Sequence, residues 1–184
     1  TRLGMAGNLA DFVLIDKDGA VKRGSEIDYN GAPGGYAADP TEVVNYVSKH
    51  DNQTLWDMIS YKAAQEADLD TRVRMQAVSL ATVMLGQGIA FDQQGSELLR
   101  SKSFTRDSYD SGDWFNRVDY SLQDNNYNVG MPRSSDDGSN YDIIARVKDA
   151  VATPGETELK QMTAFYQELT ALRKSSPLFT LGDG

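Results

Sequence analysis

The chain reads Val43-Val44-Asn45-Tyr46-Val47-Ser48-Lys49-His50-Asp51-Asn52 at the point that decides its fold. The first half of this stretch is rich in β-branched and aromatic residues, so we expect a buried strand of roughly 4–8 residues. The second half is polar and includes His50, the only histidine of the chain. A histidine and an aspartate after a buried strand stand where βα-barrel enzymes hold catalytic groups. The alternative is a satisfied polar pair that only ends the strand.

The residues that follow predict a parallel βαβ unit. Thr54 is expected to cap a short helix, with Asp57 three residues later completing a capping box. Apolar residues at helical spacing predict a longer helix over 70–85, and Gly86 is a stop signal. Ile89-Ala90-Phe91 then predicts a short buried strand. This order of strand, helix and strand is expected to cross over right-handed.

Upstream of the stretch, residues 1–39 leave two alternatives open. Asn8 could cap a helix over 9–14, or the same residues could form a strand that leads into a turn at 16–19. Residues 16–19 also resemble the start of a calcium-binding loop. Such a loop needs glutamate where Ile27 stands, so a plain turn is favoured. Residues 30–36 are expected to be loop.

Downstream, residues 92–152 are polar and aromatic with little periodicity. Loops this long are usually functional or disordered, and the many aromatic residues argue against disorder. A short helix is expected over 141–151. The final helix is predicted to begin after a Thr153 cap, with Pro154 at its first position and Glu156 completing the box.

Charge and composition narrow the classes of function. The 18 Lys and Arg against 27 Asp and Glu give a net charge of −9, which disfavours binding to nucleic acid or an anionic membrane surface. Without cysteine there is no disulfide framework. No apolar run approaches the roughly 20 residues that span a bilayer. The start at Thr1, without a methionine or a signal-peptide pattern, is expected to be a cut end.

Residues 46–52 resemble the last signature segment of the α-amylase clan of glycoside hydrolases. The longer run 45–56 is similar to that of the pullulanase and limit-dextrinase branch, and further similarity lies at 93–117 and 169–179. The resemblance therefore covers nearly the whole chain. It implies a glycoside hydrolase that cleaves α-1,6-glucosidic branch linkages in pullulan and in branched starch or glycogen dextrins, with retention of configuration.

The resemblance also implies an α/β fold, the C-terminal part of a (β/α)8 TIM barrel. A complete barrel needs about 250 residues, so the 184 residues here are expected to be incomplete on their own. Residues 1–180 would belong to the catalytic domain, as its last two βα units with a long loop after the eighth strand. Residues 181–184 would start a following C-terminal β domain.

Six residues receive roles from the resemblance. Asp51 would stabilise the transition state, as the third carboxylate of the family's site. The family's nucleophilic aspartate and general-acid glutamate lie in earlier segments that residues 1–42 lack, so this chain alone is expected to be catalytically incomplete. Glu97 is taken as structural rather than as the acid. The expected substrate-binding residues are His50, Asn52, Asp107, Tyr109 and Arg117.

The chemistry requires no cofactor; structural calcium is common in the family, but the sequence assigns no ligands to it. The expected partners are an α-glucan and the preceding barrel units of the same polypeptide, in a secreted or bacterial cell-surface protein. Two rivals stay open. A clan hydrolase or transferase acting on α-1,4 bonds would keep His50 and Asp51 but differ around 93–117. A non-catalytic glucan-binding module would explain the aromatic region without needing His50 and Asp51 at a strand tip.

Overall fold

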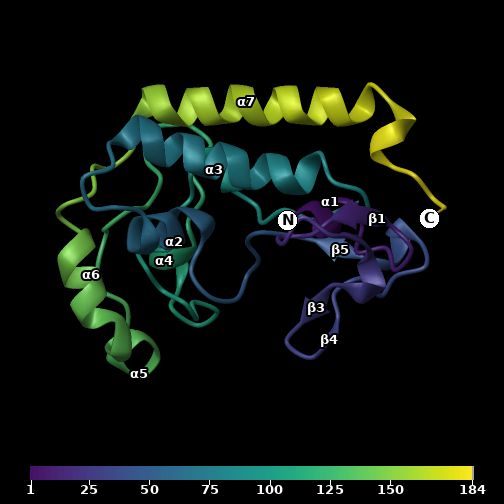
Figure 1. Ribbon diagram of the computed structural model, residues 1–184. Helices are drawn as coiled ribbons and strands as arrows, with labels where there is room; N and C mark the ends of the chain where they lie inside the picture. The colour runs from purple at the N-terminus through teal and green to yellow at the C-terminus, as the bar shows by residue number, and fades with distance from the viewer. Residues whose placement is uncertain (184) are drawn as a thin grey trace. The chain divides into compact units, whose positions relative to one another are not determined.

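The computed structural model describes residues 1–183, which fall into two compact units (Figure 1). Unit 1 comprises Thr1–Tyr46, Leu80–Phe91 and Glu168–Gly184, and unit 2 comprises Val47–Ser79 and Asp92–Gln167. Gly184, one of the four residues expected to start a following domain, lies outside the described residues. The helices are α1 Arg2–Met5, α2 Leu55–Lys62, α3 Leu69–Met84, α4 Asp113–Asn116, α5 Ser134–Asp137, α6 Tyr141–Val147 and α7 Glu156–Lys174. The strands are β1 Val13–Ile15, β2 Val21–Arg23, β3 Asp28–Tyr29, β4 Ala32–Pro33, β5 Val44–Asn45 and β6 Ile89–Ala90.

Two antiparallel hairpins form the first part of unit 1, β1 with β2 and β3 with β4. Of the two alternatives for residues 9–14, the strand is correct. The Asp16 carboxylate accepts hydrogen bonds from the Asp18 and Ala20 amides at 2.8 and 2.9 Å, which closes the first turn. The bond from Lys22, together with these amides, lowers the pKa of Asp16 to about 2.

The second hairpin corrects the expected loop at 30–36. Asn30 and Gly31 have φ angles of 54° and 86°, the left-handed conformations of a two-residue type I′ turn. An Asn-Gly pair is itself a strong hairpin signal, so this hairpin was predictable from the sequence. The apolar alternation that normally accompanies it is weak here, because all four strand residues are exposed.

The parallel pairing at the centre of unit 1 is confirmed, since β5 and β6 pair with Val44 opposite Ile89. The expected length and burial of the first strand are wrong. Its ladder spans two residues, and Val44 and Ile89 are each 50% exposed. Within residues 1–183 each strand of this pair has one strand neighbour, so its other edge is not paired with a strand. Beyond the ladder, Tyr46 meets Phe91 edge to face, with ring centroids 6.4 Å apart.

Arg173 anchors the end of α7 within unit 1. Its guanidinium donates hydrogen bonds to the carbonyl oxygens of Met84, Gly86 and Gly88, each at 2.8 Å. The last carbonyls of a helix have no partners within it. One arginine therefore satisfies the end of α3 and holds the turn that leads into β6.

Unit 2 begins with α2, whose predicted cap is confirmed, because the Thr54 hydroxyl accepts from the Asp57 amide at 3.2 Å. The Asp57 side chain does not act as the predicted capping-box partner. Its buried carboxylate instead accepts hydrogen bonds from residues 101–104, 44 to 47 positions away. A long-range contact of this kind cannot be inferred from local spacing.

The two long helices, α3 and α7, contribute residues to both units. The bounds of α3 agree with the prediction. The predicted start of α7 is wrong, because the helix begins at Glu156 and the Gly155 amide donates to the Glu158 carboxylate at 2.8 Å. The three-residue spacing of Thr153 and Glu156 recurs at Gly155 and Glu158, and there the glutamate side chain accepts the hydrogen bond at the helix start.

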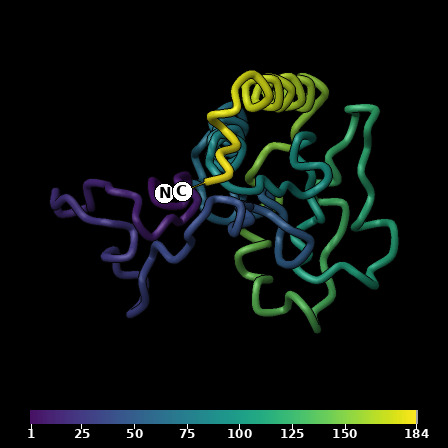
Figure 2. Tube along the Cα trace, turned by 90° about the vertical axis from the view of Figure 1, so that its right-hand side faces the viewer, coloured from purple at the N-terminus to yellow at the C-terminus, as the bar shows by residue number. Residues whose placement is uncertain are grey.

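Two aromatic side chains from 92–152, those of Phe104 and Tyr127, pack into the core of unit 2. Phe104 is fully buried and stacks on Tyr61 with ring centroids 5.7 Å apart. Tyr127 meets Phe104 edge to face at 5.1 Å. Figure 2 shows the region as teal and green loops, and α6 lies within the predicted 141–151 helix. The other large, fully buried side chains of this core include Trp56, Ile144, Leu159 and Met162.

Candidate functional site

A recess of about 500 Å³ in unit 2 brings four of the six predicted residues together. A larger cavity of about 790 Å³ lies in unit 1, lined by residues between 1 and 28. The candidate site is therefore identified by the chemistry of its lining residues and not by its volume. The predicted residues in the recess are His50, Asp51, Asp107 and Tyr109. The remaining lining residues are Gln93, Arg100, Lys102, Ser108 and Asn116.

His50 and Asp51 lie side by side on a loop that opens to solvent. The His50 Nδ1 atom is 3.4 Å from an Asp51 carboxylate oxygen, and the two side chains are 83% and 59% exposed. Lys49 forms an ion pair with the other oxygen of Asp51. The hydrogen bond from Lys49 holds the pKa of the Asp51 carboxyl below its ordinary value. Asp51 is therefore ionised across neutral and mildly acidic pH.

The loop carrying this pair starts after β5, so the two residues do not sit at the tip of a buried strand as expected. Side-chain contacts hold the loop in place. The Ser48 hydroxyl donates to the Gln93 side chain at 2.6 Å. Asn52 has a φ of 62° and accepts a hydrogen bond of 3.1 Å from the Arg106 guanidinium. The structure thus places Asn52 where it can orient the loop.

Residues 107–109 also line the recess. Ser108 and Asn116 exchange hydrogen bonds, since the Ser108 hydroxyl donates to Asn116 at 2.8 Å and the Asn116 amide donates to the Ser108 carbonyl at 2.6 Å. The preceding Arg106 amide is held by Asp137 at 3.0 Å. Tyr109 is 85% exposed, so its ring face is open to a flat apolar partner such as one face of a sugar.

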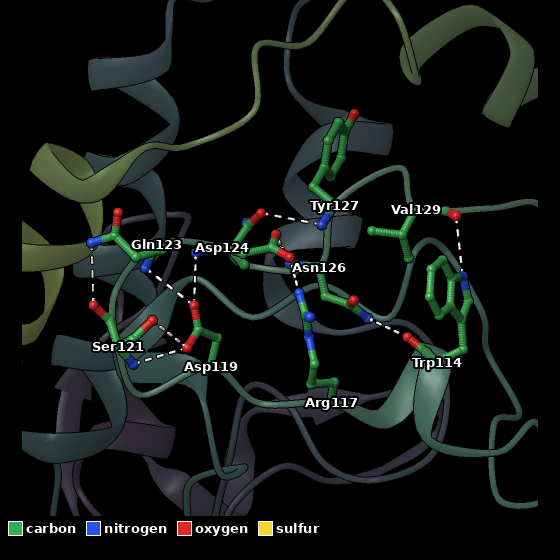
Figure 3. A network of polar contacts seen from close by, with 10 residues as sticks. Trp114, Arg117, Asp119, Ser121, Gln123, Asp124, Asn126, Tyr127 and Val129 are labelled. Carbon is green, nitrogen blue, oxygen red and sulfur yellow. Dashed lines mark hydrogen bonds and ion pairs between the residues drawn. The ribbon is translucent and has the colours of Figure 1, made fainter.

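Arg117 lines a different cavity, of about 320 Å³, together with Trp114 and Val129 (Figure 3). Its guanidinium is paired with Asp124. The neighbouring Trp114 indole donates to the Val129 carbonyl at 3.1 Å, which fixes the ring in this cavity. The structure therefore separates Arg117 from the four residues that share the recess.

Reasoning from sequence missed two cations that line the recess, the half-buried Arg100 and the buried Lys102. Arg100 donates to the Asn116 carbonyl at 2.6 Å, and Lys102 donates to the His50 carbonyl at 3.0 Å. Burial lowers the pKa of both groups. Neither residue belongs to a periodic pattern or a recognisable spacing, so only tertiary contacts identify them.

Among the residues that the structure describes, no group of three or more His, Cys, Asp or Glu side chains is arranged to hold a metal ion. Within the same part of the chain, no helix has both the length and the apolar character needed to cross a membrane.

The chain matches known proteins over its whole length. The family model for "Alpha-1,6-glucosidases, pullulanase-type, C-terminal" matches residues 122–184. A pullulanase of Klebsiella pneumoniae is 93% identical over 184 residues, which are 100% of this chain and 17% of the relative. The chloroplastic pullulanase 1 of Arabidopsis thaliana is 43% identical over 180 residues, 97% of this chain and 19% of the relative.

A solved structure agrees with these matches. The crystal structure of PulA from Klebsiella oxytoca aligns with a TM-score of 0.96 at 93% identity, covering 99% of this chain and 17% of that one. The chain spans less than a fifth of the length of these relatives. By sequence and by its mixed α/β fold, the chain belongs to the pullulanases, of which it matches one segment.

Proposed function

We propose that this segment forms part of the active site of a retaining α-1,6-glucosidase that acts on pullulan and on branched starch or glycogen dextrins. One observation carries the proposal: His50, Asp51, Asp107 and Tyr109 share one recess, although more than 50 residues separate the two pairs in sequence. The similarity to pullulanases supports the choice of substrate.

The proposed chemistry uses two carboxyl groups from outside this segment, a nucleophile and a general acid on either side of the scissile bond. Asp51 binds hydroxyl groups of the glucosyl unit at the cleavage point while its ring approaches the oxocarbenium-like transition state. Contacts that strengthen as this state forms lower the barrier rather than merely improving binding. His50 donates a hydrogen bond to the same sugar. Asp107 and Tyr109 contact the next sugar unit.

We also propose that β5 and β6 are the last two strands of a (β/α)8 barrel, with α3 and α7 as the helices that follow them. Parallel strands are normally covered on both faces, and a barrel leaves no free edge. The exposed Val44 and Ile89 side chains are therefore expected to contact other strands in a longer chain. The domain limits 1–180 and 181–184, a structural calcium ion and a secreted or cell-surface location are proposals from family resemblance alone.

Substrate choice tests the proposal in a purified pullulanase chain that contains this segment. We expect it to hydrolyse pullulan, which has α-1,6 linkages, far faster than linear amylose, which has only α-1,4 linkages. Initial products should keep the anomeric configuration, as measured by NMR. Faster turnover of amylose would favour the α-1,4-acting rival. Binding of pullulan without turnover would favour the non-catalytic module.

Removing the ring of Tyr109 should weaken substrate binding. We expect Tyr109→Ala to raise KM for pullulan by about fivefold, equivalent to ~1 kcal/mol of lost ring contact, with kcat little changed. Tyr109→Trp should restore KM because it keeps a flat ring. Tyr29 is 71% exposed on β3, so Tyr29→Ala is a matched control. An unchanged KM in Tyr109→Ala would remove Tyr109 from the proposed site.

A further inference from the structure

A buried lysine contacts the loop that carries His50 and Asp51. Lys102 is 2% exposed, and its ammonium group donates a hydrogen bond of 3.0 Å to the backbone carbonyl of His50. It also lines the recess. Lysine is almost never fully buried unless its charge is paired. Apolar packing alone therefore does not explain why this lysine is buried.

The backbone that carries Lys102 is held by a buried carboxyl group. Asp57 on α2 accepts hydrogen bonds from the Lys102 and Phe104 amides at 3.0 and 3.2 Å, and from the Ser101 hydroxyl. Ser103 and Phe104 have φ angles of 48° and 71°, a left-handed conformation that costs free energy in residues with a Cβ atom. Such a turn persists only where its surroundings specify it. The backbone position of Lys102 is therefore held by the Asp57 side chain of α2.

The charges around Lys102 tie it to Asp51. Burial and the neighbouring Arg100 oppose its positive charge, whereas Asp57, Asp107 and Asp51 favour it. In the other direction Lys102 favours the ionised form of Asp51, in addition to the larger contribution of Lys49 and that of His50. Because Lys102 is shielded from solvent, salt screens its field less than that of an exposed cation.

We propose that Lys102 is a positioning residue, which fastens the His50–Asp51 loop to the 101–104 turn and supplies a buried positive charge to the recess. This inference rests on the proposed function, because it assigns Lys102 an effect exerted through the His50–Asp51 pair. The hydrogen bond to His50 fixes the loop backbone. A displacement of about 1 Å in a catalytic group can reduce a rate about 100-fold.

Three substitutions in a full pullulanase chain containing the segment test the inference. Lys102→Met removes both the hydrogen bond and the charge, and we expect kcat on pullulan to fall about 10- to 100-fold, with a smaller change in KM. Lys102→Arg should recover part of this loss. Lys102→Gln keeps a donor but no charge, so the acid limb of its pH–rate profile should move to higher pH. The exposed Lys62 provides a matched control, and Lys62→Met should match the unsubstituted enzyme.

A double substitution separates positioning from general destabilisation. If Lys102 acts through the pair, Lys102→Met should cost much less in an Asp51→Asn background than alone. An unchanged kcat in Lys102→Met, or an equal loss in both backgrounds, would overturn the inference. If Lys102→Met does not fold, Lys102→Gln serves in the same cycle. An Asp51→Asn enzyme with full activity would instead refute the proposed function itself.

Discussion

Replacing Asp51 by asparagine in a pullulanase chain that contains this segment is expected to lower kcat on pullulan by about three orders of magnitude, equivalent to ~4 kcal/mol of transition-state stabilisation. Asparagine keeps the size of the side chain but removes the charge that would face the developing oxocarbenium ion. KM should change much less, because the lost contact is strongest in the transition state. Steady-state kinetics on pullulan measure both parameters.

The neighbouring loop offers a control of the same chemical type. Asp110 is an exposed aspartate paired with Arg133, so Asp110→Asn should leave kcat within about twofold of the unsubstituted value. The pH dependence of kcat is an independent check on the charge of Asp51. Because the hydrogen bond from Lys49 lowers the pKa of Asp51, its carboxylate stays ionised at lower pH than an ordinary aspartate does. Substantial kcat in Asp51→Asn would contradict the proposed role.

Replacing Asp57 by alanine is expected to have the largest effect on local stability, about 3 kcal/mol or more. The substitution leaves the Lys102 and Phe104 amides without their buried acceptor, in a turn that is already conformationally costly. In a full pullulanase chain, hydrogen–deuterium exchange at residues 101–104 should accelerate about 100-fold, because local opening becomes easier by this amount. Mass spectrometry of peptides from this turn measures the change.

A matched substitution distinguishes this effect from the loss of any aspartate on a helix. Asp70 lies in the first turn of α3, where it is exposed and pairs with Arg74 four residues later. Asp70→Ala should cost less than about 0.5 kcal/mol, since exposed pairs of this spacing contribute little. Unchanged exchange at 101–104 in Asp57→Ala would show that other contacts hold the turn.

Local sequence patterns predicted the elements whose stabilising contacts join residues close together in sequence. The apolar face of α3, the Thr54 cap and the strand signals at 43–47 and 89–91 were sufficient to predict helices, cap and parallel pair. Errors arose where two spacings offered the same kind of helix cap, as at the start of α7, and where a strand residue expected to be buried is half exposed, as at Val44. Periodicity reports which residues are apolar and does not report how many neighbours a strand has.

The sequence by itself determined which chemistry is present: one histidine, its neighbouring aspartate, and an aromatic and acidic stretch some 50 residues later. Only the tertiary structure decided which of these residues share a recess, that Arg117 lies in another cavity, and that Lys102 joins the recess as a buried cation. The physical reason is the range of the interactions. Caps and helix faces form between residues a few positions apart, whereas the contacts of Asp57 with 101–104 and of Lys102 with His50 join residues more than 40 positions apart.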